Sequence, residues 1–209
     1  MHMNHIDDLR AEFQRIYALS TLAKDSDEVI FSPTRHFRLE TANYLVPKSA
    51  GNWELTKVTV FDHAANEAII TFFSNWGSFF HSWFRKDDDE YLICAEDIYG
   101  GQTVIDLTNR IMSGYSPNED GFIWTDHYLS PDGDILATIG CCWACPYVIK
   151  LYDFTKPLEL PLREIKEIDL LRNDETFVGW VDNNHFRAKG EKGQRLIDTN
   201  GHFEEEHTH

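Results

Sequence analysis

The stretch "IKLYDFTKP", residues 149–157, alternates apolar and polar side chains and stops at Asp153 before a turn. Alternation with a period of two predicts a β-strand with one buried face. The same ending recurs in three other segments, "VTVFDHAAN" with Asp62, "TVIDLTNR" with Asp106 and "QRLIDTNGH" with Asp198. The four aspartates lie 44, 47 and 45 residues apart, and a nearly constant period of this length indicates a repeat architecture.

Each aspartate lies near the end of a unit, and the units share similar features in the same sequence order. Turns with Gly or Pro, such as "IYGGQ" and "WACPY", come before the aspartate-ending runs, and acidic turns such as "KDDDE" come earlier. We expect four units, at about residues 34–74, 79–115, 122–165 and 176–205, within a single domain of residues 25–209. Residues 1–24 are expected to hold an amphipathic helix, because apolar side chains recur there at helical spacing: Ile6, Leu9, Phe13, Ile16 and Tyr17.

The third unit resembles a known repeat. "FIWTDHYLSPDGDILATIGCCWACPYVIKLYDFTKP", residues 122–157, is similar to one blade of a WD40-type β-propeller. "LSPDGDILAT" corresponds to the first hairpin of such a blade, and "IKLYD" to its third strand, which ends in Trp-Asp in the family and in Tyr152-Asp153 here. The resemblance implies an all-β fold of about four propeller-like antiparallel blades, arranged as a closed four-bladed ring or as an open stack.

The four aspartates have a structural interpretation. A short acceptor at the end of a strand bonds the backbone amides of the following turn, which requires no substrate. We therefore expect Asp62, Asp106, Asp153 and Asp198 to be structural residues of the repeat and assign none of them to catalysis.

Aromatic side chains are concentrated in "FFSNWGSFFHSWF", residues 72–84. Most of them should fill the space between sheets, because stacked sheets need bulky core side chains. Those that stay exposed would form a contact surface for a partner. The candidate binding surface comprises Trp76, Phe80 and Trp83.

Three of the four cysteines lie in "GCCWACP", residues 140–146. Cys142 and Cys145 have the spacing of a redox-sensitive thiol pair or of two metal ligands. A structural metal site needs further ligands at fitting spacing, and the sequence offers none. The third possibility is packing, because Cys94 and Cys141 each lie 12 residues before a repeat aspartate and would occupy the same core position of neighbouring units. We predict no metal and no cofactor.

The charge balance argues against two classes of partner. Nineteen basic and 35 acidic residues give a net charge of −16, which opposes binding to nucleic acid and to anionic membranes. No stretch is long and apolar enough to cross a bilayer, and the first residues lack the pattern of a secretory signal. With few cysteines, these features favour a cytoplasmic protein.

The sequence contains none of the common catalytic motifs: a Gly-x-Ser-x-Gly elbow, His-Glu-x-x-His, a phosphate-binding loop or a dinucleotide fingerprint. Our leading hypothesis is a non-catalytic module that binds another protein. The alternative is a carbohydrate-binding or carbohydrate-active protein, a lectin or glycosidase, because the chain has six tryptophans and 35 carboxylates.

Overall fold

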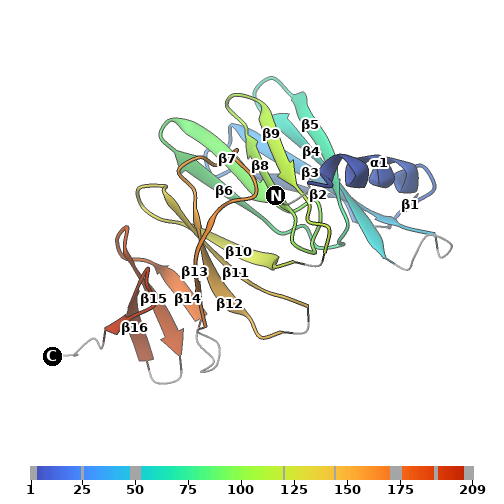
Figure 1. Cartoon of the computed structure of the whole chain (residues 1–209). Helices are drawn as coiled ribbons and strands as arrows, with labels where there is room; N and C mark the ends of the chain where they lie inside the picture. Colours follow the sequence, from blue (N-terminus) through green and yellow to red (C-terminus); the bar gives the residue numbers. More distant parts are fainter. Residues whose placement is uncertain are drawn as a thin grey trace.

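The described residues form one helix and four antiparallel sheets (Figure 1). The computed structural model describes residues 4–24, 26–47, 53–119, 121–143, 145–169, 176–190 and 193–204. Helix α1 (Ile6–Tyr17) precedes all four sheets along the chain. The prediction of an all-β fold with about four antiparallel blades and an N-terminal helix is confirmed.

The first sheet is a four-stranded meander with one added strand, β1, beside β3. Its strands are β1 (Thr21–Leu22), β2 (Glu28–Phe31), β3 (Phe37–Leu45), β4 (Glu54–Asp62) and β5 (Glu67–Ser74). Strand β1 lies inside the segment that the sequence assigned to the helix. The helix ends earlier because the Ser20 hydroxyl and the Leu19 amide both bond the carbonyl of Ile16 and close its last turn.

The other three sheets are plain four-stranded meanders, in which consecutive strands pair. The second sheet comprises β6 (His81–Lys86), β7 (Asp89–Cys94), β8 (Gln102–Asp106) and β9 (Ile111–Tyr115). The third comprises β10 (Ile123–Leu129), β11 (Ile135–Cys141), β12 (Val148–Asp153) and β13 (Glu164–Ile168). The fourth comprises β14 (Thr176–Trp180), β15 (His185–Gly190), β16 (Gly193–Asp198) and β17 (Phe203–Glu204).

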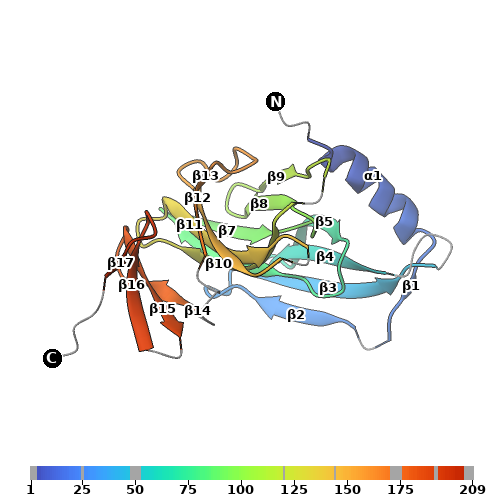
Figure 2. The ribbon, with the colours of Figure 1, turned by 60° about the horizontal axis from the view of Figure 1, so that its bottom comes forward.

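The sheets stack face to face in chain order as an open arc. The first and fourth sheets lie at opposite ends of the molecule in both views (Figures 1 and 2). Alternation along β7 shows how one strand serves two interfaces: Leu92 packs in a core cluster with the first sheet, and Ile93 packs in a cluster with the third. Both side chains are fully buried. The inner sheets are therefore apolar on both faces, whereas a sheet with one solvated face would alternate with polar residues.

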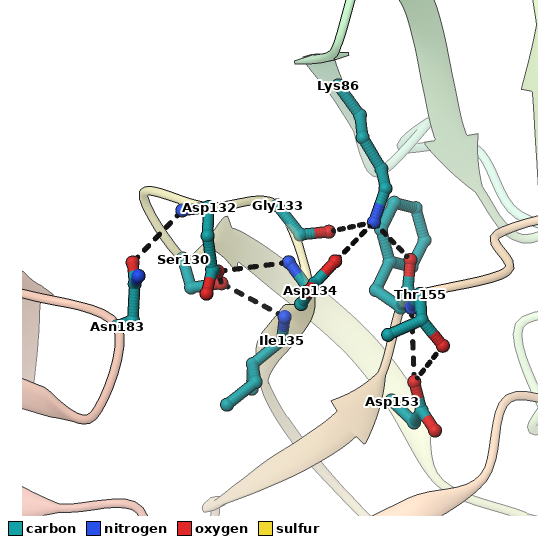
Figure 3. Close-up of polar contacts among 10 residues, drawn as sticks. Lys86, Ser130, Asp132, Gly133, Asp134, Ile135, Asp153, Thr155 and Asn183 are labelled. Atoms are coloured by element: carbon teal, nitrogen blue, oxygen red, sulfur yellow. Dashed lines mark hydrogen bonds and ion pairs between the residues drawn. The ribbon is translucent and has the colours of Figure 1, made fainter.

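Polar side chains connect neighbouring sheets at the end where the β6–β7, β10–β11 and β14–β15 hairpins turn. Lys86 reaches from the second sheet to the third, where its Nζ donates to Asp134 Oδ1 (2.6 Å) and to the carbonyls of Gly133 and Phe154 (Figure 3). The Asp132 amide in turn donates to Asn183 Oδ1 of the fourth sheet (3.0 Å). These bonds connect the second, third and fourth sheets at one end of the stack.

The four repeat aspartates occupy equivalent places. Each is the last residue of the third strand of its meander, β4, β8, β12 or β16. Their Oδ1 atoms accept from turn amides two to four residues further along: Ala65, Asn109, Thr155, and both Asn200 and His202. Hydrogen bonds from Thr155 and Arg163 lower the pKa of Asp153 to about 2, which keeps this acceptor ionised.

Helix α1 covers the edge of the stack beside β5. Its apolar face buries Ile6, Phe13 and Ile16. Arg10 forms a two-pronged bond to Glu96, with its Nη2 and Nε donating at 2.7 and 2.8 Å to a carboxylate that is fully buried. The helix is thus held by both apolar contact and a buried ion pair.

Candidate functional site

A pocket of about 450 Å³ opens at the end of the stack away from the aspartate turns. Its loops lead into the third strands β8 and β12, whereas the aspartates end those strands. The segment between β5 and β6 gives two lining residues, the β7–β8 loop two, strands β10 and β11 three, and the β11–β12 loop three. In that order they are Trp76, Phe80, Ile98, Tyr99, Ile123, Thr125, Cys141, Trp143, Cys145 and Tyr147. The pocket therefore lies where connections of the second and third sheets meet the link from the first.

Five of the ten residues that line the pocket are aromatic. Tyr99 and Trp143 come from different sheets and meet edge to face, with ring centroids 6.2 Å apart and planes at 67°. Trp143 is 64% exposed, Tyr147 45% and Trp76 38%. Large apolar side chains with this exposure, gathered around one cavity, are typical of a contact site for another molecule.

A buried carboxylate shapes the β7–β8 loop. Asp97 Oδ1 accepts from the Tyr99 amide (3.1 Å) and from Asn75 Nδ2 (2.9 Å), and its Oδ2 accepts from the Ser116 hydroxyl (2.8 Å). The side chain of Asn75 also accepts from the Ile98 amide at 2.8 Å. The side chains of Asp97 and Asn75 thus bond the segments that enter and leave the second sheet to the β7–β8 loop.

The backbone of the segment before β6 is held from behind. The Thr56 hydroxyl donates to the Trp76 carbonyl (2.5 Å), and Asn43 Nδ2 donates to the Gly77 carbonyl (2.9 Å). Thr56 is almost fully buried. Trp76 therefore stands on a fixed backbone while its ring stays accessible, which is the pre-organised state that limits the entropy cost of binding.

Two glycines permit a close approach of loops under the pocket. A Cβ on Gly100 would lie 2.7 Å from Gly121 Cα, and Gly100 has a φ of +106°. Both the contact and the backbone angle exclude a side chain at this position. The β7–β8 loop and the connection into β10 can meet only because Gly100 and Gly121 lack side chains.

The lining offers apolar surface and few polar groups. No lining residue carries a formal charge, and the Thr125 hydroxyl already donates to the Ile139 carbonyl (3.1 Å). Burial raises the pKa of the Cys141 thiol, so this group stays protonated at neutral pH. The pocket has no acid and base pair of its own, and its chemistry is that of apolar contact.

The structure brings together some of the predicted site residues and separates others. Trp76 and Phe80 both line the pocket. Trp83 lies outside it, in the core between the first and second sheets, and its Nε1 is buried without a partner in the described part of the chain. Cys145 lines the pocket, and Cys142 is exposed beside it.

Sequence reasoning missed Tyr99, Trp143 and Tyr147. Trp143 lies inside the cysteine-rich segment, whose pattern draws attention to the thiols and not to the indole. The repeat period contained a usable signal, because the β7–β8 and β11–β12 loops are equivalent loops of adjacent units and must lie at one end of the stack. Aromatic residues in such equivalent loops are brought close by stacking alone.

A second, smaller cavity of about 280 Å³ lies behind the Trp76 segment. Its lining is mostly polar: Ser26, Glu28, Ile30, Thr41, Asn43, Thr56, Gly77, Ser78 and Phe79. Asn43 and Thr56 lie together there, with Thr56 Oγ1 2.7 Å from Asn43 Oδ1, and each bonds a backbone carbonyl of the Trp76 segment. Much of its polar surface therefore serves to hold the backbone.

The described residues contain no group of three or more His, Cys, Asp or Glu side chains placed to hold a metal ion. Among the same residues, no helix has the length and apolar character needed to span a membrane.

No protein-family model matches the chain. An uncharacterised protein of Acanthamoeba polyphaga mimivirus is 33% identical to it over 128 residues, which are 60% of this chain and 50% of that protein. The chain therefore spans about half the length of this relative.

Solved structures of similar fold include β-propeller proteins. A β-propeller domain of Swd1 from Myceliophteria thermophila aligns over 89% of this chain and 87% of its own, with a TM-score of 0.42 and 9% identity. Periplasmic gluconolactonase of Pseudomonas aeruginosa aligns over 85% and 51%, with a TM-score of 0.47 and 15% identity. TolB of Acinetobacter baumannii aligns over 85% and 41%, with a TM-score of 0.41 and 13% identity. These scores are low and carry no argument about function, and the fold class rests on the four sheets themselves.

Proposed function

We propose that the chain is a non-catalytic protein-binding module whose pocket takes an apolar side chain from a partner protein. One observation carries the proposal: five aromatic rings and no charged group line a cavity of about 450 Å³. Rigid aromatic walls of this kind provide most of the binding energy at protein interfaces, because they bury large areas at low entropy cost. The WD40-like resemblance of residues 122–157 supports a scaffold role and stays part of the proposal.

The net charge of the chain restricts which partner proteins are favoured. A net charge of −16 attracts basic segments and repels acidic ones. The pocket itself is uncharged, so basic residues of a partner would lie at its rim. We therefore expect a segment with an aromatic or long aliphatic side chain flanked by Lys or Arg.

The carbohydrate alternative fits the pocket less well. Sugars present hydroxyl groups on every side, and a site for them needs convergent polar groups as well as an aromatic platform. Among the lining residues the polar groups are two tyrosine hydroxyls, two indole N–H groups, two thiols and Thr125, which is already bonded. This composition favours an apolar side chain over a sugar ring.

Selection from a random peptide display library tests the proposal. Peptides that bind the wild-type chain should share one large apolar residue and basic neighbours. Trp143→Ala should weaken their binding at least tenfold, because truncation of a central tryptophan typically costs about 2 kcal/mol or more. Trp143 is 64% exposed, so its removal should leave folding intact.

Phe31→Ala is the matched control, because Phe31 is 43% exposed and lies outside the pocket. Binding should be unchanged in this variant. Equal loss in both variants, or no enrichment at all, would argue against the proposal. A saturable change in tryptophan emission with oligosaccharides, lost in Trp143→Ala, would favour the carbohydrate alternative instead.

A further inference from the structure

Three of the four cysteines gather beside the pocket, in two different states of exposure. Cys141 and Cys145 line it, and Cys142 follows Cys141 directly. Cys142 and Cys145 are exposed, whereas Cys94 is fully buried and its burial raises its pKa well above the ordinary value. Because a thiol must be accessible in order to react, Cys142 and Cys145 are the reactive candidates.

The backbone already brings these two residues together. The Cys145 amide donates to the Cys142 carbonyl at 2.8 Å, a bond that closes a four-residue turn. Such a turn keeps its first and last Cα atoms within about 7 Å. Disulfides span Cα separations of about 4.4–6.8 Å, so this turn permits a disulfide with little movement of the backbone.

The same turn carries one wall of the pocket. Trp143 lies within it and contacts Tyr99 of the neighbouring sheet, with ring centroids 6.2 Å apart. Trp143 is 64% exposed, so its position depends on this ring contact and on the backbone that carries it. Fixing the turn therefore restricts the positions that the indole can take.

We propose that Cys142 and Cys145 form a reversible disulfide at the rim of the pocket, and that this disulfide holds Trp143 in its pocket-lining position. The oxidant is a low-molecular-weight disulfide such as oxidised glutathione. One cysteine thiolate attacks it and releases one glutathione thiol, leaving a mixed disulfide on the chain. The second cysteine attacks the protein sulfur and releases the second glutathione, so the two thiol hydrogens and two electrons of the chain end on the two glutathione molecules.

Oxidation should increase the affinity of the pocket, and this part rests on the proposed function. A locked turn removes part of the ordering cost of binding, which corresponds to an affinity about three- to tenfold higher in the oxidised chain. Linkage requires the reverse effect as well, so a bound peptide should make the disulfide harder to reduce by the same factor.

The test titrates the full chain in buffers of increasing ratio of oxidised to reduced glutathione. Peptide mapping by mass spectrometry should locate a Cys142–Cys145 disulfide at the oxidising ratios. Cys142→Ser and Cys145→Ser should each abolish it, whereas Cys141→Ser should retain it. The indole N–H resonance of Trp143, assigned with Trp143→Phe, should shift with the same midpoint.

Two results would overturn the inference: thiols that stay free at the most oxidising buffer, or a disulfide that forms without any change at Trp143. Neither readout requires a partner, so both separate this inference from the proposed function. Peptides selected on the wild-type chain then measure the affinity change, and equal affinity in both redox states would exclude the coupling to binding.

Discussion

At the residue scale, the least usual environment is that of His127. Its ring is buried between the second and third sheets, where Nδ1 lies 3.2 Å from the Ser82 hydroxyl. Its Nε2 has no hydrogen-bond partner among the described residues. Burial, with a smaller effect of His81, lowers the pKa of His127 to about 3. The folded chain therefore holds this imidazole neutral across the ordinary pH range.

This burial predicts a loss of stability in mild acid. Above pH ~6.5 the residue is neutral in both the folded and unfolded states, but below it only the unfolded chain takes up a proton. The free energy of unfolding should therefore fall by about 2 kcal/mol more in the wild type than in His127→Gln between pH 7 and pH 5. Urea unfolding of both chains at the two pH values measures the difference. Equal pH slopes would show that His127 is protonated or accessible in the folded state.

The repeat aspartates and the aromatic segment show which features of the structure can be predicted from local sequence. An aspartate bonds the amides of its own turn, so its position follows from a few neighbouring residues. Trp76 and Trp83 are seven residues apart in one aromatic segment, yet one lines the pocket and the other lies in the core. Which of them is accessible depends on the facing sheet, and local sequence carries no information about that.

At the scale of elements, a buried ion pair joins helix α1 to the second sheet in addition to the apolar contacts of the helix. Glu96 is fully buried and accepts from Arg10 and from the Thr103 hydroxyl (3.1 Å). A buried carboxylate is tolerated only while it is paired. The helix therefore contributes to the stability of the second sheet.

Arg10→Ala should lower the free energy of unfolding by about 3 kcal/mol, because it leaves the Glu96 charge buried and unpaired. Arg15→Ala is the control on the same helix, since Arg15 is exposed and bonds only the carbonyl of Ala11 among the contacts described. This variant should stay within about 0.5 kcal/mol of the wild type. Chemical denaturation compares the three chains. Similar stability of the two variants would show that the ion pair does not anchor the helix.

Equivalent elements also differ in ways that the sequence could not show. Cys94 and Cys141 end the second strands of adjacent sheets, opposite His81 and Ile123 respectively. Cys94 is fully buried, whereas Cys141 is half-buried and lines the pocket. The repeat period predicted their equivalence. Their difference arises because the β11–β12 loop leaves space against the neighbouring loops, and that space appears only once the sheets are stacked.

At the scale of the whole molecule, the two ends of the open arc differ in what they contribute. Polar bonds such as that of Lys86 connect the sheets at one end, and the β7–β8 and β11–β12 loops form much of the pocket at the other (Figures 1 and 3). The pocket draws on four separate stretches of the chain, so its existence depends on correct stacking of the second and third sheets. The sheets supply rigidity and the loops supply the contact surface, as is common in folds built from repeated units.

The most direct test of this account is the methyl spectrum of isoleucine-labelled chain during titration with a peptide selected on the pocket. Ile98 and Ile123 line the pocket, whereas Ile111 is 50% exposed at the opposite end and serves as the internal control. We predict progressive shifts of the Ile98 and Ile123 methyl signals, an unchanged Ile111 signal, and loss of all shifts in Trp143→Ala. Shifts at Ile111 with unchanged Ile98 and Ile123 signals would contradict the account, because binding would then occur away from the aromatic pocket.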